Sequence, residues 1–382
     1  MIILERPYTS PEMVQYLVES QTPVLDNAEA RRTPEHNRFN LHDDASFARL
    51  LNSGKRLYTT SETALSWVHA NATDAALIHG ITVMKDKFRL REALRPLYPD
   101  YRFREVRADE LPDIDAESLP LPLVLKPTVG FFSVGVYVVN TVDDWRKAVL
   151  DIQARRAKWK AEYPSAVVGD DRFILEEYIT GDEYAVDVYF DDAGEPVIVD
   201  ILRHEFGSFE DVGDRLYYTS PEIIRQRLDE FGGYMKKAGE ILGLRNFPAH
   251  VELRLSEKGI IPIEFNPLRF AGWCTTEISL FSYGFRTYDY YLRNARPDWD
   301  ALLKGREGNI YSFVILDKSR KMPDNAVFDY AAARASFTEV LHERRVDAPD
   351  SPVFGFFFTR TPANNRAELD RIMRSDLTEY LR

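Results

Sequence analysis

The chain has 382 residues, more than the roughly 100–150 of one compact domain, so we expect two or three subdomains. Hydrophobic residues make up 45% and charged residues 29%, which excludes a disordered chain, a coiled coil and a collagen-like fibre. With 49 Lys and Arg against 61 Asp and Glu, the net charge is −12. An acidic chain repels nucleic acid and anionic lipid, so we expect neither nucleic acid nor a membrane as a partner.

Cys274 is the only cysteine, which excludes an intrachain disulfide and a zinc site built from several cysteines. The first charges, Glu5 and Arg6, follow only a few apolar residues, unlike the apolar region of a signal peptide. No apolar run approaches the roughly 18 residues of a membrane span. We therefore expect a cytoplasmic protein.

The first 85 residues alternate short apolar strands with helices. Ser10, which precedes Pro11, and Ser61 indicate helix starts, because serine side chains cap helix N-termini. The expected strands are 2–4, 23–25 and 57–60. Strands that alternate with helices predict a small parallel sheet, and we assign residues 1–85 to an N-terminal α/β domain.

Residues 86–305 combine helices with longer strands. Apolar spacing predicts helices that begin near Asp86, Thr141 and Ser220, and the acidic, proline-containing stretch 109–121 is typical of a hinge. The expected strands are 123–125, 173–176, 183–190, 197–201, 249–255 and 260–266. The last segment, 306–382, is expected to be a C-terminal α+β segment, with strands near 311–316 and 353–358 and a helix from about Asn365.

The most informative stretch is the predicted β-hairpin over 249–267, because both of its strands alternate. One apolar face contains Val251, Leu253, Leu255, Ile261, Ile263 and Phe265. A three-residue loop, 257–259, with glycine in the left-handed position predicts a type I turn followed by a bulge. The pairs that follow from this register are Ser256 with Ile260, Glu252 with Glu264, and His250 with Asn266.

Two carboxylates that face each other across a β-ladder repel, so a chain that keeps Glu252 and Glu264 there is expected to supply a cation. Oxygen ligands, the two carboxylates and the amide of Asn266, suit magnesium or manganese rather than zinc. Magnesium leaves room for waters or phosphate oxygens, which indicates a metal-bound nucleotide. The alternative is a solvated hairpin face whose charges are screened by lysines.

Residues 126–136 join two apolar strands through a loop of small residues that includes Gly130, Ser133 and Gly135. Small residues let backbone N–H groups approach a phosphate closely, and Lys126 at the strand end adds a positive charge. No Gly-Lys-Ser/Thr follows and no helix begins at the glycines, so this is neither a Walker A loop nor a dinucleotide fingerprint. The alternative is an ordinary β-turn.

Residues 176–183 leave one strand and start another. An extended connector beside apolar residues offers backbone donors and acceptors to the edge of a base, and a carboxylate on the next strand can hold ribose hydroxyls. This stretch alone does not identify a ligand.

The order of these pieces resembles the ATP-grasp superfamily. Lys87 comes first, Lys126 and its small-residue loop second, the connector 176–183 third, and the hairpin with Glu252 and Glu264 last. The resemblance covers roughly residues 85–275 and is nearest to the carboxylate–amine ligases, including dipeptide ligases. It implies an ATP-grasp domain over 86–305, with a lid at about 123–180, that follows an N-terminal Rossmann-like domain.

The resemblance implies a role for each of these positions. Glu252, Glu264 and Asn266 would hold Mg²⁺. The lysines and the small-residue loop would contact ATP phosphates, the connector would bind adenine, and the carboxylate after it would bind the ribose. These ATP-binding candidates are Lys87, Lys126, Gly130, Ser133, Gly135, Glu176, Glu177, Ile179 and Glu183.

Two arginines are candidate catalytic residues by the same resemblance. Relatives often carry arginine directly after Asn-Pro, whereas here Leu268 intervenes, so Arg269 reaches an acyl phosphate only if the loop bulges. Arg203, on the strand after the turn at 191–194, would touch the terminal phosphate. The alternative for Arg203 is a surface salt bridge.

The implied chemistry is ATP-dependent ligation of a small carboxylate to a small amine through an acyl phosphate, with Arg269 stabilising the oxyanion. The alternatives are an ATP-binding regulatory or scaffold protein without turnover, an ATP-grasp kinase and a carboxylate–thiol ligase. The segment 306–382 could cap the active site or form a homodimer interface. The aromatic residues near the site could line a substrate pocket or belong to the core; they are Trp273, Tyr283, Phe285 and Tyr288.

Overall fold

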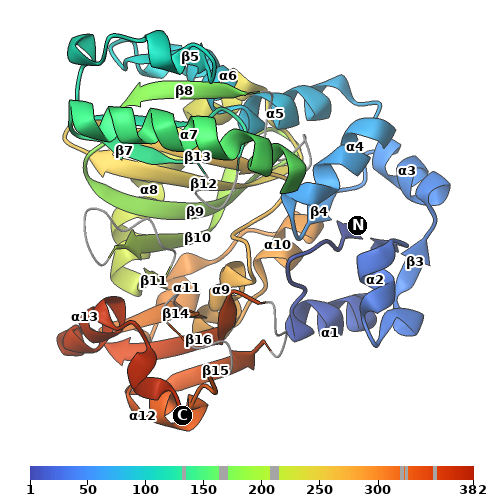
Figure 1. Cartoon of the computed structure of the whole chain (residues 1–382). Coiled ribbons are helices and arrows are strands. Elements are labelled where there is room, and N and C mark those ends of the chain that lie inside the picture. The colour runs from blue at the N-terminus through green and yellow to red at the C-terminus, as the bar shows by residue number, and fades with distance from the viewer. Residues whose placement is uncertain (131–134, 163–170, 207–214, 319–321, 323–325, 347–350) are drawn as a thin grey trace.

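The computed structural model describes the chain except residues 131–134, 163–170, 207–214, 319–321, 323–325 and 347–350. It combines a parallel sheet near the N-terminus with two antiparallel sheets, as Figure 1 shows. This arrangement confirms the predicted mixed α/β class. In the part of the chain that is described, no helix combines the length and the apolar composition needed to cross a membrane.

The N-terminal sheet is parallel, as predicted, with the strand order β3-β2-β1-β4. Its strands are β1 (Ile2–Ile3), β2 (Pro23–Leu25), β3 (Asn40–His42) and β4 (Tyr58–Thr59). Its helices are α1 (Pro11–Ser20), α2 (Ala28–Arg32), α3 (Asp44–Asn52), α4 (Leu65–Asn71) and α5 (Ala75–Lys85). Ser10 caps α1, because its Oγ accepts a hydrogen bond from Met13 N at 3.0 Å.

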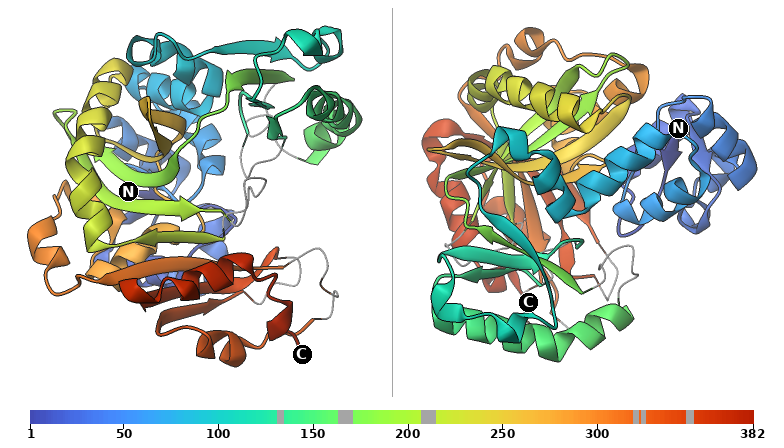
Figure 2. Two further views of the ribbon diagram at one scale, coloured as in Figure 1. Left: turned by 90° about the vertical axis from the view of Figure 1, so that its left-hand side faces the viewer. Right: turned by 90° about the horizontal axis from the view of Figure 1, so that it is seen from above.

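A second, antiparallel sheet has the order β5-β8-β6-β7. Its strands are β5 (Phe103–Arg107), β6 (Leu123–Pro127), β7 (Tyr137–Val139) and β8 (Arg172–Glu177). Helix α6 (Lys87–Ala93) precedes β5, and α7 (Val142–Glu162) packs at β7 on the side away from the large sheet (Figure 2). Leu123, Leu125, Trp145 and Ile152 belong to the separate core of this unit.

The third sheet has eight antiparallel strands in the order β13-β12-β9-β10-β11-β14-β16-β15. The strands are β9 (Asp182–Phe190), β10 (Pro196–Glu205), β11 (Leu216–Thr219), β12 (Phe247–Ser256), β13 (Gly259–Pro267), β14 (Asn309–Asp317), β15 (Val340–Arg345) and β16 (Val353–Pro362). Helix α8 (Pro221–Leu242) packs against β10. The remaining helices are α9 (Ile278–Tyr283), α10 (Thr287–Arg293), α11 (Trp299–Leu303), α12 (Tyr330–Ala335) and α13 (Ala367–Arg374).

The C-terminal segment continues this large sheet. Strand β14 pairs with β11, β16 pairs with β14, and β15 forms the edge (Figure 1). The β12–β13 hairpin lies at the opposite edge of the same sheet. The carboxylate hairpin and residues after 306 therefore share one sheet.

Candidate active site

Residues from both antiparallel sheets and from the segment after β4 line one cavity of about 480 Å³. Strand β6 contributes Lys126, β9 contributes Glu183, and β12 contributes Glu252. The N-terminal domain contributes Thr60, which follows β4. This volume is typical of a small-molecule site, and the fold brings segments that are far apart in the sequence to its walls.

The β12–β13 hairpin places Glu252 directly opposite Glu264 and His250 opposite Asn266, as predicted. Residues opposite each other in a ladder project from the same face. Glu252 and Glu264 accordingly both line the cavity, while Asn266 is buried beside Glu264.

The turn of this hairpin differs from the predicted one. Two residues, Glu257 and Lys258, connect the strands, and Ser256 pairs with Gly259. The predicted three-residue loop was wrong. A bulge next to Glu252 shifts the register by one residue. Glu252 therefore still pairs with Glu264, although the turn is one residue shorter than predicted.

The bulge also changes the environment of two isoleucines that were predicted to share the apolar face of Val251. Val251 is buried in the main core. Ile261 instead packs with Ile179 in a small separate cluster, and Ile263 lines the cavity. An extra residue in one strand turns the side chains after it relative to the partner strand, which explains this correction.

Glu264 and Glu252 differ in their partners. Glu264 Oε2 lies 2.7 Å from Lys87 Nζ, and Oε1 accepts a hydrogen bond from Asn266 Nδ2 at 3.1 Å. Burial disfavours the charge of Glu264, but Lys87 outweighs burial and holds its pKa far below the usual range. Burial and the charge of Glu264 raise the pKa of Glu252, whose nearest basic partner among the described residues is His250 Nε2 at 3.5 Å. Glu252 would therefore gain most from an added cation.

The candidate metal ligands at this hairpin are oxygen atoms of Glu252, Glu264 and Asn266. Within the ranges that the structure describes, no group of three or more His, Cys, Asp or Glu side chains is placed so that it could hold a metal ion. A divalent ion here would need phosphate or water oxygens to complete its coordination. That requirement fits Mg²⁺, which usually keeps waters and substrate phosphates among its ligands.

His250 is held by a carboxylate at each ring nitrogen. Nδ1 lies 2.7 Å from Asp187 Oδ1, and Nε2 lies 3.5 Å from Glu252 Oε1. Burial opposes a charged ring, but the two carboxylates outweigh burial and raise the pKa of His250 to about 9. Asp187 also accepts hydrogen bonds from Ala271 N at 2.9 Å and Thr276 Oγ1 at 2.7 Å. One buried carboxylate thus orients both the histidine and the loop after β13.

Both lysines predicted to contact phosphate line the cavity. Lys126 Nζ lies 2.6 Å from Glu176 Oε1, and Arg91 Nε lies 2.8 Å from Glu176 Oε2. Burial disfavours the charge of Glu176, but Arg91 and Lys126 outweigh it and lower its pKa to about 2. Burial lowers the pKa of Lys126, whereas Glu264 raises the pKa of Lys87 against the effect of burial.

Glu177 at the end of β8 and Ile179 in the connector to β9 line the cavity, and Glu183 follows on β9. Glu183 Oε1 lies 2.8 Å from His204 Nδ1, and Oε2 lies 3.0 Å from Arg254 Nε. The predictions missed His204 and Arg254 as cavity residues. Arg254 could have been found, because it lies on the same hairpin face as the carboxylates, whereas nothing local marked His204.

Besides Asn266, two predicted positions that the structure describes, Arg203 and Gly135, do not line the cavity. Arg203 bonds Asp182 at 2.8 Å instead, because side chains alternate along β10 and its neighbour His204 faces the cavity. Gly135, with a φ of +75°, does not line the cavity. Ser133 lies outside the described residues, whereas Gly130 lines the cavity.

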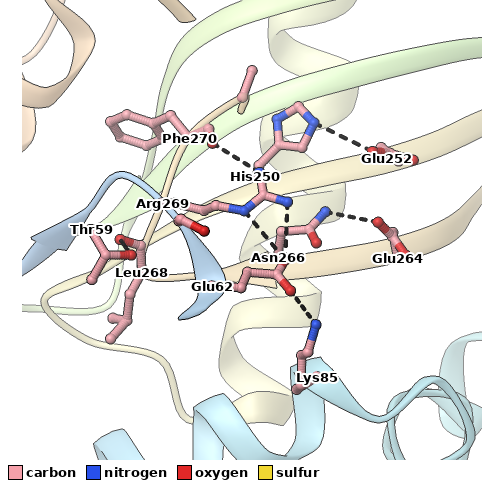
Figure 3. Close-up of polar contacts among 12 residues, drawn as sticks. Thr59, Glu62, Lys85, His250, Glu252, Glu264, Asn266, Leu268, Arg269 and Phe270 are labelled. Atoms are coloured by element: carbon pink, nitrogen blue, oxygen red, sulfur yellow. Dashed lines mark hydrogen bonds and ion pairs between the residues drawn. The ribbon is translucent and has the colours of Figure 1, made fainter. Parts of the chain in front are cut away.

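Leu268 precedes Arg269 in a left-handed backbone conformation. Its φ is +59°, in the left-handed region, and its carbonyl accepts a hydrogen bond from Thr59 N at 2.8 Å. Arg269 lines the cavity, where Nη2 lies 2.9 Å from Glu62 Oε1 (Figure 3). Glu62 also bonds Lys85, as Figure 3 shows, so the N-terminal domain holds this arginine. The predictions missed Glu62, for which no sequence signal was present.

The aromatic residues near the site divide into two groups. Trp273 lines the cavity. Tyr283, Phe285 and Tyr288 are buried in the main core. These three residues therefore belong to the core, and Trp273 belongs to the cavity wall.

Comparison with known proteins gives a family match for the central part of the chain. Residues 119–277 match the family model described as the ATP-grasp domain. The chain is 28% identical over 170 residues to a D-alanine–D-alanine ligase of Haemophilus influenzae, a match that covers 43% of this chain and 52% of that protein. It is 27% identical over 213 residues to an alanine–anticapsin ligase of Bacillus subtilis, covering 50% of this chain and 42% of that protein. The chain thus spans about half the length of these curated relatives.

Solved structures share the fold over the whole chain. The L-amino acid ligase from Bacillus licheniformis matches with a TM-score of 0.68 at 16% identity, covering 100% of this chain and 97% of that one. A carboxyaminoimidazole ribonucleotide synthase from Aspergillus clavatus, complexed with ATP, matches with a TM-score of 0.65 at 17% identity, covering 100% and 98%. At these identities the matches show similarity of fold.

Proposed function

We propose that the chain, whose residues 119–277 match the ATP-grasp domain, is an ATP-dependent ligase that activates a carboxylate and joins it to an amine. Similar proteins are named as ligases of D-alanine, alanine and L-amino acids. Those names support an amino acid as one of the two small substrates. The arrangement of charges in the cavity supports the same chemistry.

ATP would lie along the wall formed by β6, β8 and β9. Glu177 at the end of β8 and Ile179 in the connector would contact the adenine, and Glu183 would bind the ribose hydroxyls. Glu176 would act through Lys126, because it holds that ammonium group at 2.6 Å. Lys126, Lys87 and the backbone at Gly130 would then contact the phosphates.

Glu252, Glu264 and Asn266 would hold Mg²⁺. The ion supplies positive charge that offsets the charge of the triphosphate. The unequal pairing of the carboxylates supports this assignment, because Lys87 already compensates Glu264 while the pKa of Glu252 is raised by burial and repulsion.

The reaction would proceed in two steps. An oxygen of the substrate carboxylate attacks the γ-phosphorus, and ADP leaves with the electron pair of the broken P–O bond. The amine nitrogen then attacks the acyl carbon, phosphate leaves, and the amine gives up a proton as the C–N bond forms. Arg269, held at 2.9 Å by Glu62, would stabilise the oxyanion of this second step.

One observation carries the proposal: the facing pair Glu252 and Glu264 shares a cavity with Lys87, Lys126 and Arg269. The test is a screen for ADP release over pairs of amino acids and small acids in the presence of magnesium. We expect ADP release that requires both a carboxylate and an amine, together with a product containing a new C–N bond. ADP release without an amine would indicate a kinase, and transfer to a thiol would indicate a carboxylate–thiol ligase. ATP binding without turnover on any pair would indicate a regulatory protein.

A further inference from the structure

Arg91 is a buried cation that lies behind the cavity wall. It belongs to α6, its side chain is 4% exposed, and it is not part of the described wall. Its partner Glu176 does line the cavity, and so does Lys126, which holds the other oxygen of the same carboxylate. A cation, a carboxylate and a second cation therefore follow one another from the interior to the cavity.

The two oxygens of Glu176 are divided between the two cations. Oε2 lies 2.8 Å from Arg91 Nε, and Oε1 lies 2.6 Å from Lys126 Nζ. While Arg91 holds Oε2, only Oε1 is left for the lysine. One carboxylate thus compensates two cations, and the group keeps one positive charge in excess. Where water is largely excluded, such a charge attracts an anionic ligand group strongly.

Arg91 is itself fixed from two other sides. Its Nη1 donates a hydrogen bond to the carbonyl oxygen of Pro262 on β13 at 2.6 Å. Its guanidinium group lies over the ring of Tyr101, 4.9 Å from the ring centroid. A planar guanidinium that is bound through several donors keeps its direction. Arg91 is therefore a rigid point to which Oε2 of Glu176 is attached.

The other phosphate lysine is arranged differently. Lys87 lies one helical turn before Arg91 on α6, and its Nζ lies 2.7 Å from Glu264 Oε2 on the carboxylate hairpin. At Glu264, the second cation beside the lysine would be the proposed Mg²⁺. At Glu176, the second cation is Arg91. The protein thus supplies from its own chain the charge that would otherwise be missing next to Lys126.

We propose that Arg91 is a positioning residue for Lys126: it binds one oxygen of Glu176 and compensates its charge, so that the lysine ammonium group stays oriented towards the phosphates of ATP. Without Arg91, Glu176 would turn both oxygens to Lys126 and neutralise it. The inference rests on the proposed ATP site, in which Lys126 contacts phosphate, and adds to that site a residue outside the cavity.

The test compares the affinity for a non-hydrolysable ATP analogue with the affinity for adenosine, both measured by calorimetry in the presence of magnesium. The ratio of the two affinities reports the contribution of the phosphates. Arg91→Met should lower this ratio about 10–100-fold, the range for losing a hydrogen bond to a charged group, and change the affinity for adenosine little. Lys126→Met removes the ammonium group itself and sets the largest loss expected. Arg91→Lys keeps a positive charge beside Glu176 and should retain more of the ratio than Arg91→Met.

A double variant tests whether Arg91 acts through Glu176. Breaking a buried ion pair is destabilising, whereas Arg91→Met combined with Glu176→Gln removes both charges and spares the interior an unpaired carboxylate. In the Glu176→Gln background, Arg91→Met should change the ratio by less than about 2-fold, because the carboxylate that linked it to Lys126 is gone. This comparison stands even if Arg91→Met alone does not fold.

Arg344→Met is the matched control. The side chain of Arg344 is 2% exposed and is paired with Glu12 and Glu277, and it is not part of the described cavity wall. Its loss should lower the free energy of unfolding and leave the ratio unchanged. The control separates the loss of any buried arginine from the loss of the one that holds Glu176.

The outcomes distinguish this inference from the proposed function. An Arg91→Met variant that folds and keeps the wild-type ratio overturns the inference, and so does one that loses affinity for adenosine and for the ATP analogue equally. A loss that is as large in the Glu176→Gln background also overturns it. If Lys126→Met keeps the wild-type ratio, the phosphate contact of Lys126 and the role of Arg91 fail together. The predicted ratios without ADP release on any substrate pair support the role of Arg91 and overturn the ligase.

Discussion

Replacing Glu264 with glutamine removes one of the two facing carboxylates and keeps the size of the side chain. If Glu252 and Glu264 hold Mg²⁺, the variant should bind Mg²⁺ and ATP together less tightly. Its affinity for ATP without metal should stay the same or rise, because a negative charge has left the cavity. Glu264→Gln should therefore weaken ATP binding when magnesium is present, and should leave it unchanged or strengthen it when magnesium is absent.

The expected size follows from the contacts of Glu264. Loss of a residue that only hydrogen-bonds to a metal ligand typically weakens metal binding about 10–100-fold, which is about 1.4–2.8 kcal/mol. Loss of a ligand itself should therefore cost at least this much. The fold should survive. Lys87 loses its carboxylate at 2.7 Å, but the two side chains are 11% and 20% exposed, and repulsion with Glu252 is relieved. We expect the free energy of unfolding to fall by less than about 3 kcal/mol, the lower end for breaking a buried ion pair.

The assay is calorimetric titration of ATP with and without magnesium, together with the rate of ADP release on the best substrate pair. Glu183→Gln is the matched control, since it removes a carboxylate from the same cavity but from the proposed ribose site. It should weaken ATP binding equally with and without magnesium. A Glu264→Gln variant with unchanged magnesium dependence and unchanged turnover would refute the metal assignment.

Three further predictions concern charged side chains. Arg269→Met should lower kcat for product formation by about 10²–10³-fold in steady-state kinetics and change ATP binding little; an unchanged kcat would remove the oxyanion role. The pKa of Glu176 is lowered to about 2, chiefly by Arg91 and Lys126 against the effect of burial. The ionised Glu176 therefore adds to the free energy of unfolding fully above its ordinary pKa of 4.5, and this contribution is lost as pH falls towards 2. Glu176→Gln should therefore flatten the pH dependence of urea unfolding in that window; a slope equal to that of wild type would contradict this. Burial raises the pKa of Asp200 to about 8, so the folded state binds the proton more tightly and the free energy of unfolding falls between pH 3.8 and about 8. Asp200→Asn should remove this fall and be more stable than wild type at pH 8 by urea unfolding, and a less stable variant would count against it.

Much of the geometry of the proposed nucleotide and metal site could be predicted because its signals are local. Alternation with a period of two is a property of each strand, so Glu252 and Glu264 could be placed opposite each other from the sequence of one hairpin. The order of Lys87, Lys126 and the later carboxylates along the chain indicated the ATP-grasp resemblance, which the family match over 119–277 confirms. Even here, the turn was predicted one residue too long, because a bulge depends on how the strand lies on its neighbours.

The rest depended on contacts between segments that are distant in sequence. Glu62 meets Arg269 across 207 residues, and His204 enters the cavity only because β10 lies between β9 and β11. Nothing local marks such residues, since the pairing order of strands is decided by packing of the whole sheet. The same packing turned Arg203 away from the cavity and brought Ile315 of the C-terminal segment to it. The sequence by itself determined where the paired carboxylates and the basic residues lie along the chain, because charge, spacing and alternation are local, and the tertiary structure decided which distant side chains surround them.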